Sequence, residues 1–123
     1  LVTVNYLLRS VESIDDRKGE WTVQLTFRQS WTDERLQFNH SRISYLSLPG
    51  NYEARIWKPD TFFKEARGGR HNQLLQSNHL IRVYPDGTVL YSTHISLTLS
   101  CPMGFRHYPF DRQICQISLA SCK

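Results

Sequence analysis

The sequence lacks the signatures of common enzyme sites. Its 123 residues contain no glycine-rich phosphate loop, no nucleophile elbow and no metal-ligand spacing of cysteine and histidine. The five histidines are scattered along the chain. Asp15 and Asp16 are adjacent, so they point apart on an extended chain and make a poor acid–base pair. We therefore expect no enzyme, no cofactor and no metal site.

Long apolar runs are absent as well. No stretch approaches the roughly 18 apolar residues of a membrane-spanning helix, and the chain opens on Leu1 in a strand-like pattern, without a signal peptide or an initiator methionine. We expect it to be an excerpt of a longer protein. The net charge of +4 comes from basic residues spread along the chain, which argues against nucleic-acid binding.

Cysteines are few and odd in number, three in all. Cys101 and Cys115 each end a strand-like run, whereas Cys122 is left over. In the cytosol such a pair is more often two free thiols. A glycosylation sequon at Asn39 favours a secreted compartment, in which disulfides form. These residues alone leave both states of the pair open.

The dominant pattern is an alternation of apolar and polar residues. Residues 20–28 alternate throughout, and further runs cover residues 2–8, 88–101 and 115–119. This period of two is typical of half-buried β-strands. Turn residues separate the runs, above all Pro85-Asp86-Gly87. We expect an all-β fold, an immunoglobulin-like antiparallel β-sandwich that is incomplete because its last strands are missing.

Two arginines are predicted to be neighbours when the first two strands are paired as a hairpin. A hairpin that turns at residues 18–19 predicts that Arg9 and Arg28 lie directly opposite each other, about 5 Å apart. Their repulsion would be relieved by an anion between them, because guanidinium groups bind carboxylates bidentately. The alternatives are exposed arginines that lean apart, or one paired with Glu20 or Glu34. A one-residue slip in register would move a side chain to the other face.

The segment between Cys101 and Cys115 is unusually apolar for a loop. It carries four large apolar side chains, Met103, Phe105, Tyr108 and Phe110. Either the loop folds back on its own core, or it forms a docking surface for another apolar element. Tyr108-Pro109 is also a bond at which a cis peptide is permitted.

Several of these motifs together resemble the Cys-loop family of pentameric ligand-gated ion channels. The loop from Cys101 to Cys115, with Tyr108-Pro109-Phe110-Asp111 within it, is similar to the family's signature loop. Trp57-Lys58-Pro59-Asp60 resembles its Trp-x-Pro-Asp motif, residues 23–36 resemble its second strand, and residues 96–103 resemble its anion-selective branch. Within that branch the chain resembles invertebrate glutamate-gated chloride channels. Residues 1–123 would then be part of an extracellular ligand-binding domain with a disulfide between Cys101 and Cys115.

The resemblance implies one wall of an agonist site at a subunit boundary. Arg9 and Arg28 match the arginines that hold the carboxylates of glutamate, and Thr26 and Ser92 match the same wall. Phe63 falls in the first loop of the opposite, principal face. The aromatic box and capping loop of that face are absent from the chain, so we expect the chain not to bind agonist alone.

The resemblance also implies partners and a location. These are an amino-acid neurotransmitter, homologous subunits of a pentamer, and the membrane domain of a multi-pass synaptic protein that keeps this domain outside the cell. The first turn and the tip of the disulfide loop would press on that membrane domain to open the pore, through Asp15, Asp16, Phe105, Pro109, Phe110 and Asp111. The alternatives are a GABA- or glycine-gated subunit, a soluble pentameric protein of the same fold without a pore, and an unrelated adhesion-type sandwich.

Overall fold

The chain folds almost entirely into β-strands. The computed structural model describes residues 1–39, 41–67, 79–110 and 112–121. In chain order its elements are β1 (Thr3–Asp15), β2 (Glu20–Thr32), the 3-10 helix η1 (Glu34–Leu36), β3 (Leu46–Leu48), the 3-10 helix η2 (Gly50–Arg55), β4 (Thr61–Phe63), β5 (His79–Val83), β6 (Thr88–Ser100) and β7 (Leu119–Ser121). No helix in these described ranges is long and apolar enough to cross a membrane.

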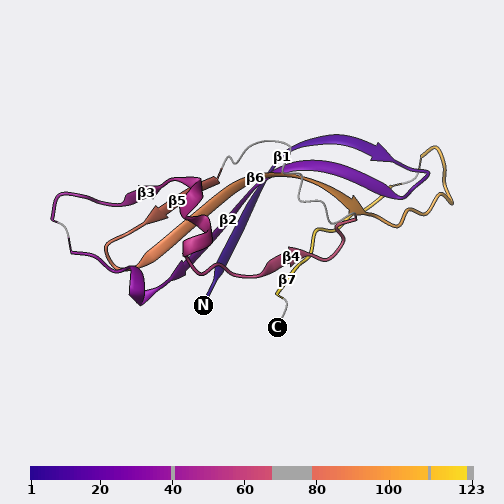
Figure 1. Cartoon of the computed structure of the whole chain (residues 1–123). Coiled ribbons are helices and arrows are strands. Elements are labelled where there is room, and N and C mark those ends of the chain that lie inside the picture. Colours follow the sequence, from indigo (N-terminus) through magenta and orange to yellow (C-terminus); the bar gives the residue numbers. More distant parts are fainter. Residues whose placement is uncertain (40, 68–78, 111, 122–123) are drawn as a thin grey trace.

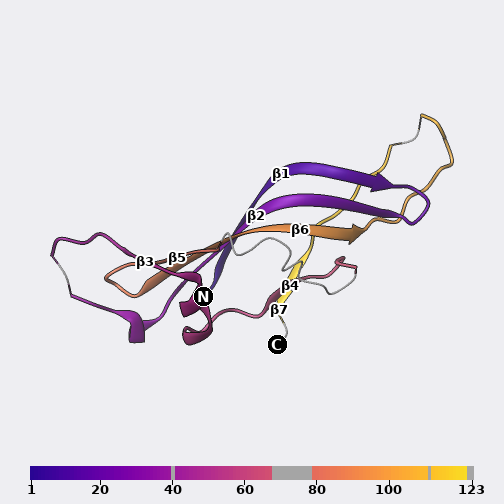
Figure 2. The ribbon, with the colours of Figure 1, turned by 45° about the horizontal axis from the view of Figure 1, so that its top comes forward.

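The strands form two antiparallel sheets. The larger is five-stranded in the order β1-β2-β6-β5-β3, and the smaller pairs β4 with β7. In both ribbon views the small sheet lies to one side of the long strands (Figures 1 and 2). The all-β, sandwich-like arrangement expected from the alternating sequence is confirmed.

The alternation along β2 decides which of its side chains enter the core. Val23 and Leu25 are fully buried and Phe27 nearly so, while Gln24 and Arg28 point to the other face and are exposed. Residues of the small sheet, Phe63 and Leu119 among them, pack against this cluster. The inner face of β2 is therefore covered by β4 and β7, and its outer face is left open to solvent over Arg28.

The tight turn expected at Pro85-Asp86-Gly87 is present. The N–H of Gly87 donates to the carbonyl of Tyr84 at 2.9 Å, and the N–H of Tyr84 donates to the carbonyl of Thr88 at 2.8 Å. Gly87 has φ of 89°, a left-handed conformation that suits glycine. The last alternating run forms a shorter strand than expected, because residues 115–118 precede β7 without joining a ladder.

The expected pairing of Arg9 with Arg28 is wrong. The partner of Arg28 in β1 is Asn5, and β1 contains two register shifts, between Leu8 and Ser10 and between Val11 and Ser13. Each shift is a β-bulge that adds one residue to β1 without adding one to β2. The ladder also ends at the pair Asp15 and Glu20, which centres the turn on residues 17–18 and not on residues 18–19. This offset and the two bulges together displace Arg9 along the strand.

Candidate functional site

A group of polar side chains shares the outer face of the large sheet. On β6, Ser92 is the direct partner of Arg28, and His94 is the direct partner of Thr26. Directly opposite residues in an antiparallel pair project to the same side, as do residues two apart on one strand. Thr26, Arg28, Ser92 and His94 therefore occupy one face, on the two central long strands.

Arg9 reaches the same face from β1. Because of the first bulge, Arg9 and Ser10 both lie opposite Gln24. The Nη1 atom of Arg9 lies 3.3 Å from Nδ1 of His94, across β2. The two arginines are thus brought to one side of the sheet, offset along it and not directly opposite. We call the set Arg9, Thr26, Arg28, Ser92 and His94 the arginine face.

The two arginines are accessible to a ligand. Both side chains are exposed, and Ser92 is half-buried. Arg28 makes no ion pair or side-chain hydrogen bond with any residue that the structure describes. Guanidinium donors in this state are free to bind a carboxylate bidentately. The arginine face can therefore hold an anionic group.

Thr26 is the buried member of the arginine face and contacts His94. Its side chain is only 3% exposed, and its Oγ1 lies 2.9 Å from Nδ1 of His94. The shared strand face with Arg28 is as expected, but burial limits direct contact between Thr26 and a ligand. His94 was not singled out from the sequence, although it stands two residues after Ser92 and so has the same orientation.

The acidic side chain that β1 brings to this face is already engaged. The carboxylate of Glu12 accepts a hydrogen bond from the amide of Gln24, and Oγ of Ser96 donates to it at 3.4 Å. On the β5 side, Arg82 stacks over the ring of Tyr45 at 4.6 Å. Neither group pairs with Arg9 or Arg28, so the face keeps a net positive charge.

Phe63 lies away from the arginine face. Its ring packs edge-on against Phe27 with centroids 5.3 Å apart, on the core side of β2. Phe63 and Arg28 therefore belong to opposite faces of the large sheet. This separation is compatible with two different subunit faces, as the resemblance implies for Phe63.

The disulfide loop and the first turn meet at one end of the molecule. Cys101 and Cys115 form a disulfide with their Cα atoms 5.3 Å apart. The loop extends at the same end as the β1–β2 turn in both ribbon views (Figures 1 and 2). Asp16 and Arg17 of the turn line a shallow hollow together with Phe105 and Tyr108 of the loop.

The loop tip is apolar and open to solvent. Phe105, Tyr108 and Phe110 are 44%, 72% and 93% exposed, so the loop does not fold back on the core of its own domain. The Tyr108–Pro109 peptide is cis.

In the β1–β2 turn, the carboxylate of Asp15 accepts hydrogen bonds from the N–H groups of Arg17 and Lys18, both at 3.1 Å. Asp111 lies outside the described residues, as does Cys122.

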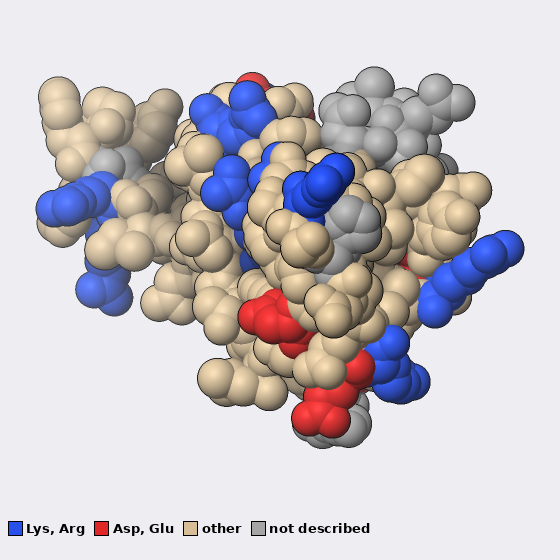
Figure 3. Space-filling model, turned by 90° about the vertical axis from the view of Figure 1, so that its left-hand side faces the viewer, with Lys and Arg blue, Asp and Glu red and all other residues tan. Residues whose placement is uncertain are grey.

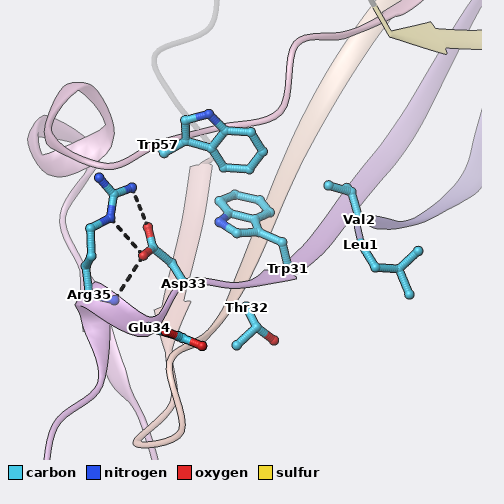
Figure 4. Close-up of a pocket in the computed structure, with 8 residues that line it drawn as sticks. All are labelled: Leu1, Val2, Trp31, Thr32, Asp33, Glu34, Arg35 and Trp57. Atoms are coloured by element: carbon cyan, nitrogen blue, oxygen red, sulfur yellow. Dashed lines mark hydrogen bonds and ion pairs between the residues drawn. The ribbon is translucent and has the colours of Figure 1, made fainter.

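A second hollow lies at the other end of β2. It has a volume of about 480 Å³ and is lined by Leu1, Val2, Trp31, Thr32, Asp33, Glu34, Arg35 and Trp57. Figure 4 shows Arg35 bonded to Asp33, with the ring of Trp57 above that of Trp31. Hydrogen bonds from Arg35 hold the pKa of Asp33 below its usual value. The guanidinium of Arg35 is already paired with Asp33, and Glu34 adds a second acid to the lining, so this hollow offers less to an anionic ligand than the arginine face.

The described residues form no single basic patch on the end of the molecule that carries η1 and β3. Figure 3 views this end, where basic side chains are spread over the whole face and most visible acidic ones lie in the lower half. Nucleic acids bind to basic residues that cluster on one face.

Asn39, the sequon asparagine, is exposed.

Comparisons with known proteins agree with these observations. The sequence model of the neurotransmitter-gated ion-channel ligand binding domain matches residues 1–123. A glutamate-gated chloride channel of Drosophila melanogaster is 48% identical over 98% of this chain, and a glutamate-gated chloride channel subunit beta of Haemonchus contortus is 38% identical over 98% of it. The chain spans 26% and 28% of the lengths of these two relatives.

The match over the whole chain, the disulfide loop and the antiparallel sheets point to one conclusion. The chain belongs to the family of neurotransmitter-gated ion-channel ligand-binding domains, and it is similar to glutamate-gated chloride channels.

Proposed function

We propose that this chain is part of the extracellular agonist-binding domain of an anion-selective pentameric channel gated by glutamate. The observation that carries the proposal is the arginine face, on which Arg9 and Arg28 are exposed and Arg28 has no partner among the described residues. Glutamate has two carboxylates, and each arginine can bind one of them bidentately. Ser92, the cross-strand partner of Arg28, would add a hydroxyl to the same wall.

The arginine face would form one wall of a site between two subunits. It lies on an open side of the large sheet, and the remaining wall, which holds the amine of the transmitter, would come from the principal face of a neighbouring subunit. Phe63, on the opposite side of the sheet, belongs in this arrangement to the principal face. The parent protein would sit in the synaptic plasma membrane with this domain outside the cell.

The exposed tip of the disulfide loop would contact the membrane domain. An apolar surface that includes Phe105 and Phe110 is costly to leave in water, and it lies next to the β1–β2 turn that carries Asp15 and Asp16. Together with Pro109, and with Asp111, whose placement is not described, these residues would pass a movement of the sheet to the pore.

Arginine substitution in the full-length receptor tests whether Arg9 and Arg28 bind the carboxylates of glutamate. Replacing Arg9 or Arg28 by Ala removes a charge-assisted hydrogen bond worth roughly 1.5–3 kcal/mol, so the glutamate concentration for half-maximal current should rise roughly 10- to 100-fold. Lys64→Ala is the matched control, because Lys64 is exposed and follows β4, on the other sheet. Surface expression should stay the same in all three variants.

The same assay separates glutamate from its competitors. GABA and glycine carry one carboxylate each, so they cannot engage both arginines as glutamate does. A receptor that responds to GABA or glycine at lower concentrations than to glutamate, or that keeps its glutamate sensitivity in both arginine variants, contradicts the proposed ligand. A parent chain that is secreted as a soluble pentamer contradicts the proposed channel.

A further inference from the structure

His94 contacts two members of the arginine face through one ring nitrogen. Its Nδ1 lies 3.3 Å from Nη1 of Arg9 and 2.9 Å from Oγ1 of Thr26. A guanidinium group has N–H donors and no acceptor. The contact with Arg9 is therefore a hydrogen bond only when Nδ1 carries no proton, which assigns the neutral tautomer with its proton on Nε2.

The imidazole is anchored more firmly than the arginine. Thr26 is buried in β2, a strand that is paired on both sides, and its hydroxyl can donate to Nδ1. Arg9 by contrast stands at a bulge of the edge strand β1 with an exposed side chain. No other hydrogen bond or ion pair holds its guanidinium among the described residues. Nδ1 has a single lone pair, which the hydroxyl of Thr26 and the guanidinium of Arg9 share. His94 is thus a fixed acceptor that orients a long and otherwise free side chain.

Building on the function proposed above, we propose that neutral His94 is a positioning residue for the agonist site. It holds Arg9 in place through the Nδ1 hydrogen bond, so that a ligand carboxylate meets an ordered guanidinium. An arginine that is already ordered loses less conformational entropy when the ligand binds. Protonation of His94 removes the acceptor and places a second cation beside Arg9, which releases the guanidinium and weakens agonist binding.

The charged groups around His94 do not remove this effect. From β1 it faces Arg9 and Glu12, from β2 Arg28, and from β5 the same sheet face carries Arg82. The Glu12 carboxylate is bonded to Gln24 and Ser96 and not to the imidazole. A protonated His94 would therefore stand among arginines without a carboxylate partner within the described part of the chain.

Two substitutions at one position separate positioning from general damage. In His94→Asn, the side-chain amide oxygen takes the place of Nδ1 and accepts a hydrogen bond at any pH, whereas His94→Ala has no acceptor. We would measure displacement of a bound competitor by L-glutamate on full-length receptors, with surface expression checked for each variant. At about pH 7.5, His94→Ala should weaken glutamate binding roughly 5- to 10-fold, the equivalent of one hydrogen bond. His94→Asn should stay within about 2-fold of the unmodified receptor.

Acidification supplies the second readout. When the pH is lowered from about 7.5 to about 5.5, glutamate binding should weaken several-fold in the unmodified receptor and should not change in His94→Asn. The variant is a matched control, because it binds the same ligand and keeps every other titratable group. This comparison remains informative even if His94→Ala fails to reach the cell surface. Tighter binding at acid pH would overturn the proposal, because it would mean that protonated His94 attracts the ligand directly.

A double-mutant cycle tests whether His94 acts through Arg9. The variant that combines Arg9→Ala with His94→Ala should bind glutamate no more weakly than Arg9→Ala alone. Additive losses, or a loss in His94→Asn as large as that in His94→Ala, would contradict a positioning role. Failure of the proposed function is distinguishable, because it would appear as an unchanged glutamate sensitivity in Arg28→Ala, whatever the His94 variants do.

Discussion

The carbonyl oxygen of Gly19 accepts a 2.7 Å hydrogen bond from the backbone N–H of Cys101. Gly19 closes the β1–β2 turn and Cys101 begins the disulfide loop, so one backbone bond joins two segments that are far apart in sequence. Both segments are proposed to contact the membrane domain. Their relative position is therefore set within the domain before any such contact forms.

Gly19→Ala should destabilise this junction. Gly19 has φ of 64°, and a Cβ atom at this position would lie 3.2 Å from the carbonyl oxygen of Cys101. The left-handed conformation costs a non-glycine residue about 1–2 kcal/mol, so the midpoint of thermal inactivation should fall. Gly104→Ala is the control, since a Cβ there meets nothing within 4 Å. Equal midpoints for the two variants would show that the turn does not depend on glycine.

Loss of the disulfide should cost more. Cys101 and Cys115 are 14 residues apart in sequence, and closing a loop of this size contributes about 3 kcal/mol in the chain-entropy description. We expect Cys101→Ser to reduce the amount of folded receptor at the cell surface strongly. Non-reducing peptide mapping of the unmodified protein should recover Cys101 joined to Cys115, and a peptide that links Cys122 to either residue would contradict the pairing.

Glu53 should make stability depend on pH in the acid range. Burial raises the pKa of Glu53, but hydrogen bonds from Lys58 and Tyr91 outweigh burial, so the pKa lies below the ordinary value of 4.5. A carboxyl with a depressed pKa in the folded state stabilises the fold above its unfolded pKa, and this contribution is lost as the pH falls through the folded pKa.

The comparison of Glu53→Gln with the unmodified protein checks this sign. The variant should have a lower thermal midpoint at neutral pH, and the difference should shrink and then vanish as the pH falls through the lowered folded-state pKa of Glu53. Glu34→Gln is the control, because Glu34 is exposed and makes no side-chain bond with a described residue. A difference that persists unchanged in acid would mean that the charge of Glu53 does not stabilise the fold.

Asn39 should carry a glycan if the domain is exported as proposed. The side chain is exposed, and the sequon asparagine with Ser41 two residues on is an acceptor for N-glycosylation. Treatment with an endoglycosidase should lower the apparent mass of the receptor, and Asn39→Gln should already run at the lower mass. An unmodified Asn39 in protein recovered from the cell surface would exclude this site.

Local patterning predicted the strands well and their mutual register poorly. The alternation from Trp21 to Phe27 identified both the strand and its buried face, because a period of two depends only on neighbouring residues. The opposition of Arg9 and Arg28 was wrong for two reasons: the turn is centred on residues 17–18 and not on 18–19, and the bulges in β1, which have no marker in its sequence, shift all pairings beyond them. The shared face of the two arginines was nevertheless found, since the displacement moved Arg9 along the sheet and left its guanidinium on the outer side.

His94 shows what sequence reasoning could not supply. A single histidine in a strand is usually solvated. Here the pairing with Thr26 across the strands and the bulge at Arg9 bring two side chains to one ring nitrogen of His94. The disulfide was left open on the cysteines alone, and the resemblance of the loop to a known family resolved it correctly.

Strand β6 links the proposed agonist site to the disulfide loop without interruption. It runs from Thr88 past Ser92 and His94 to Ser100, directly before Cys101, and it is hydrogen-bonded to β2 over its full length. At about 3.4 Å per residue, the part from Ser92 to Ser100 is a stiff rod of roughly 27 Å. A strand that is paired along its whole length moves as a rigid unit. A transmitter that draws Ser92 toward a neighbouring subunit would therefore also displace the base of the disulfide loop, at the other end of β6.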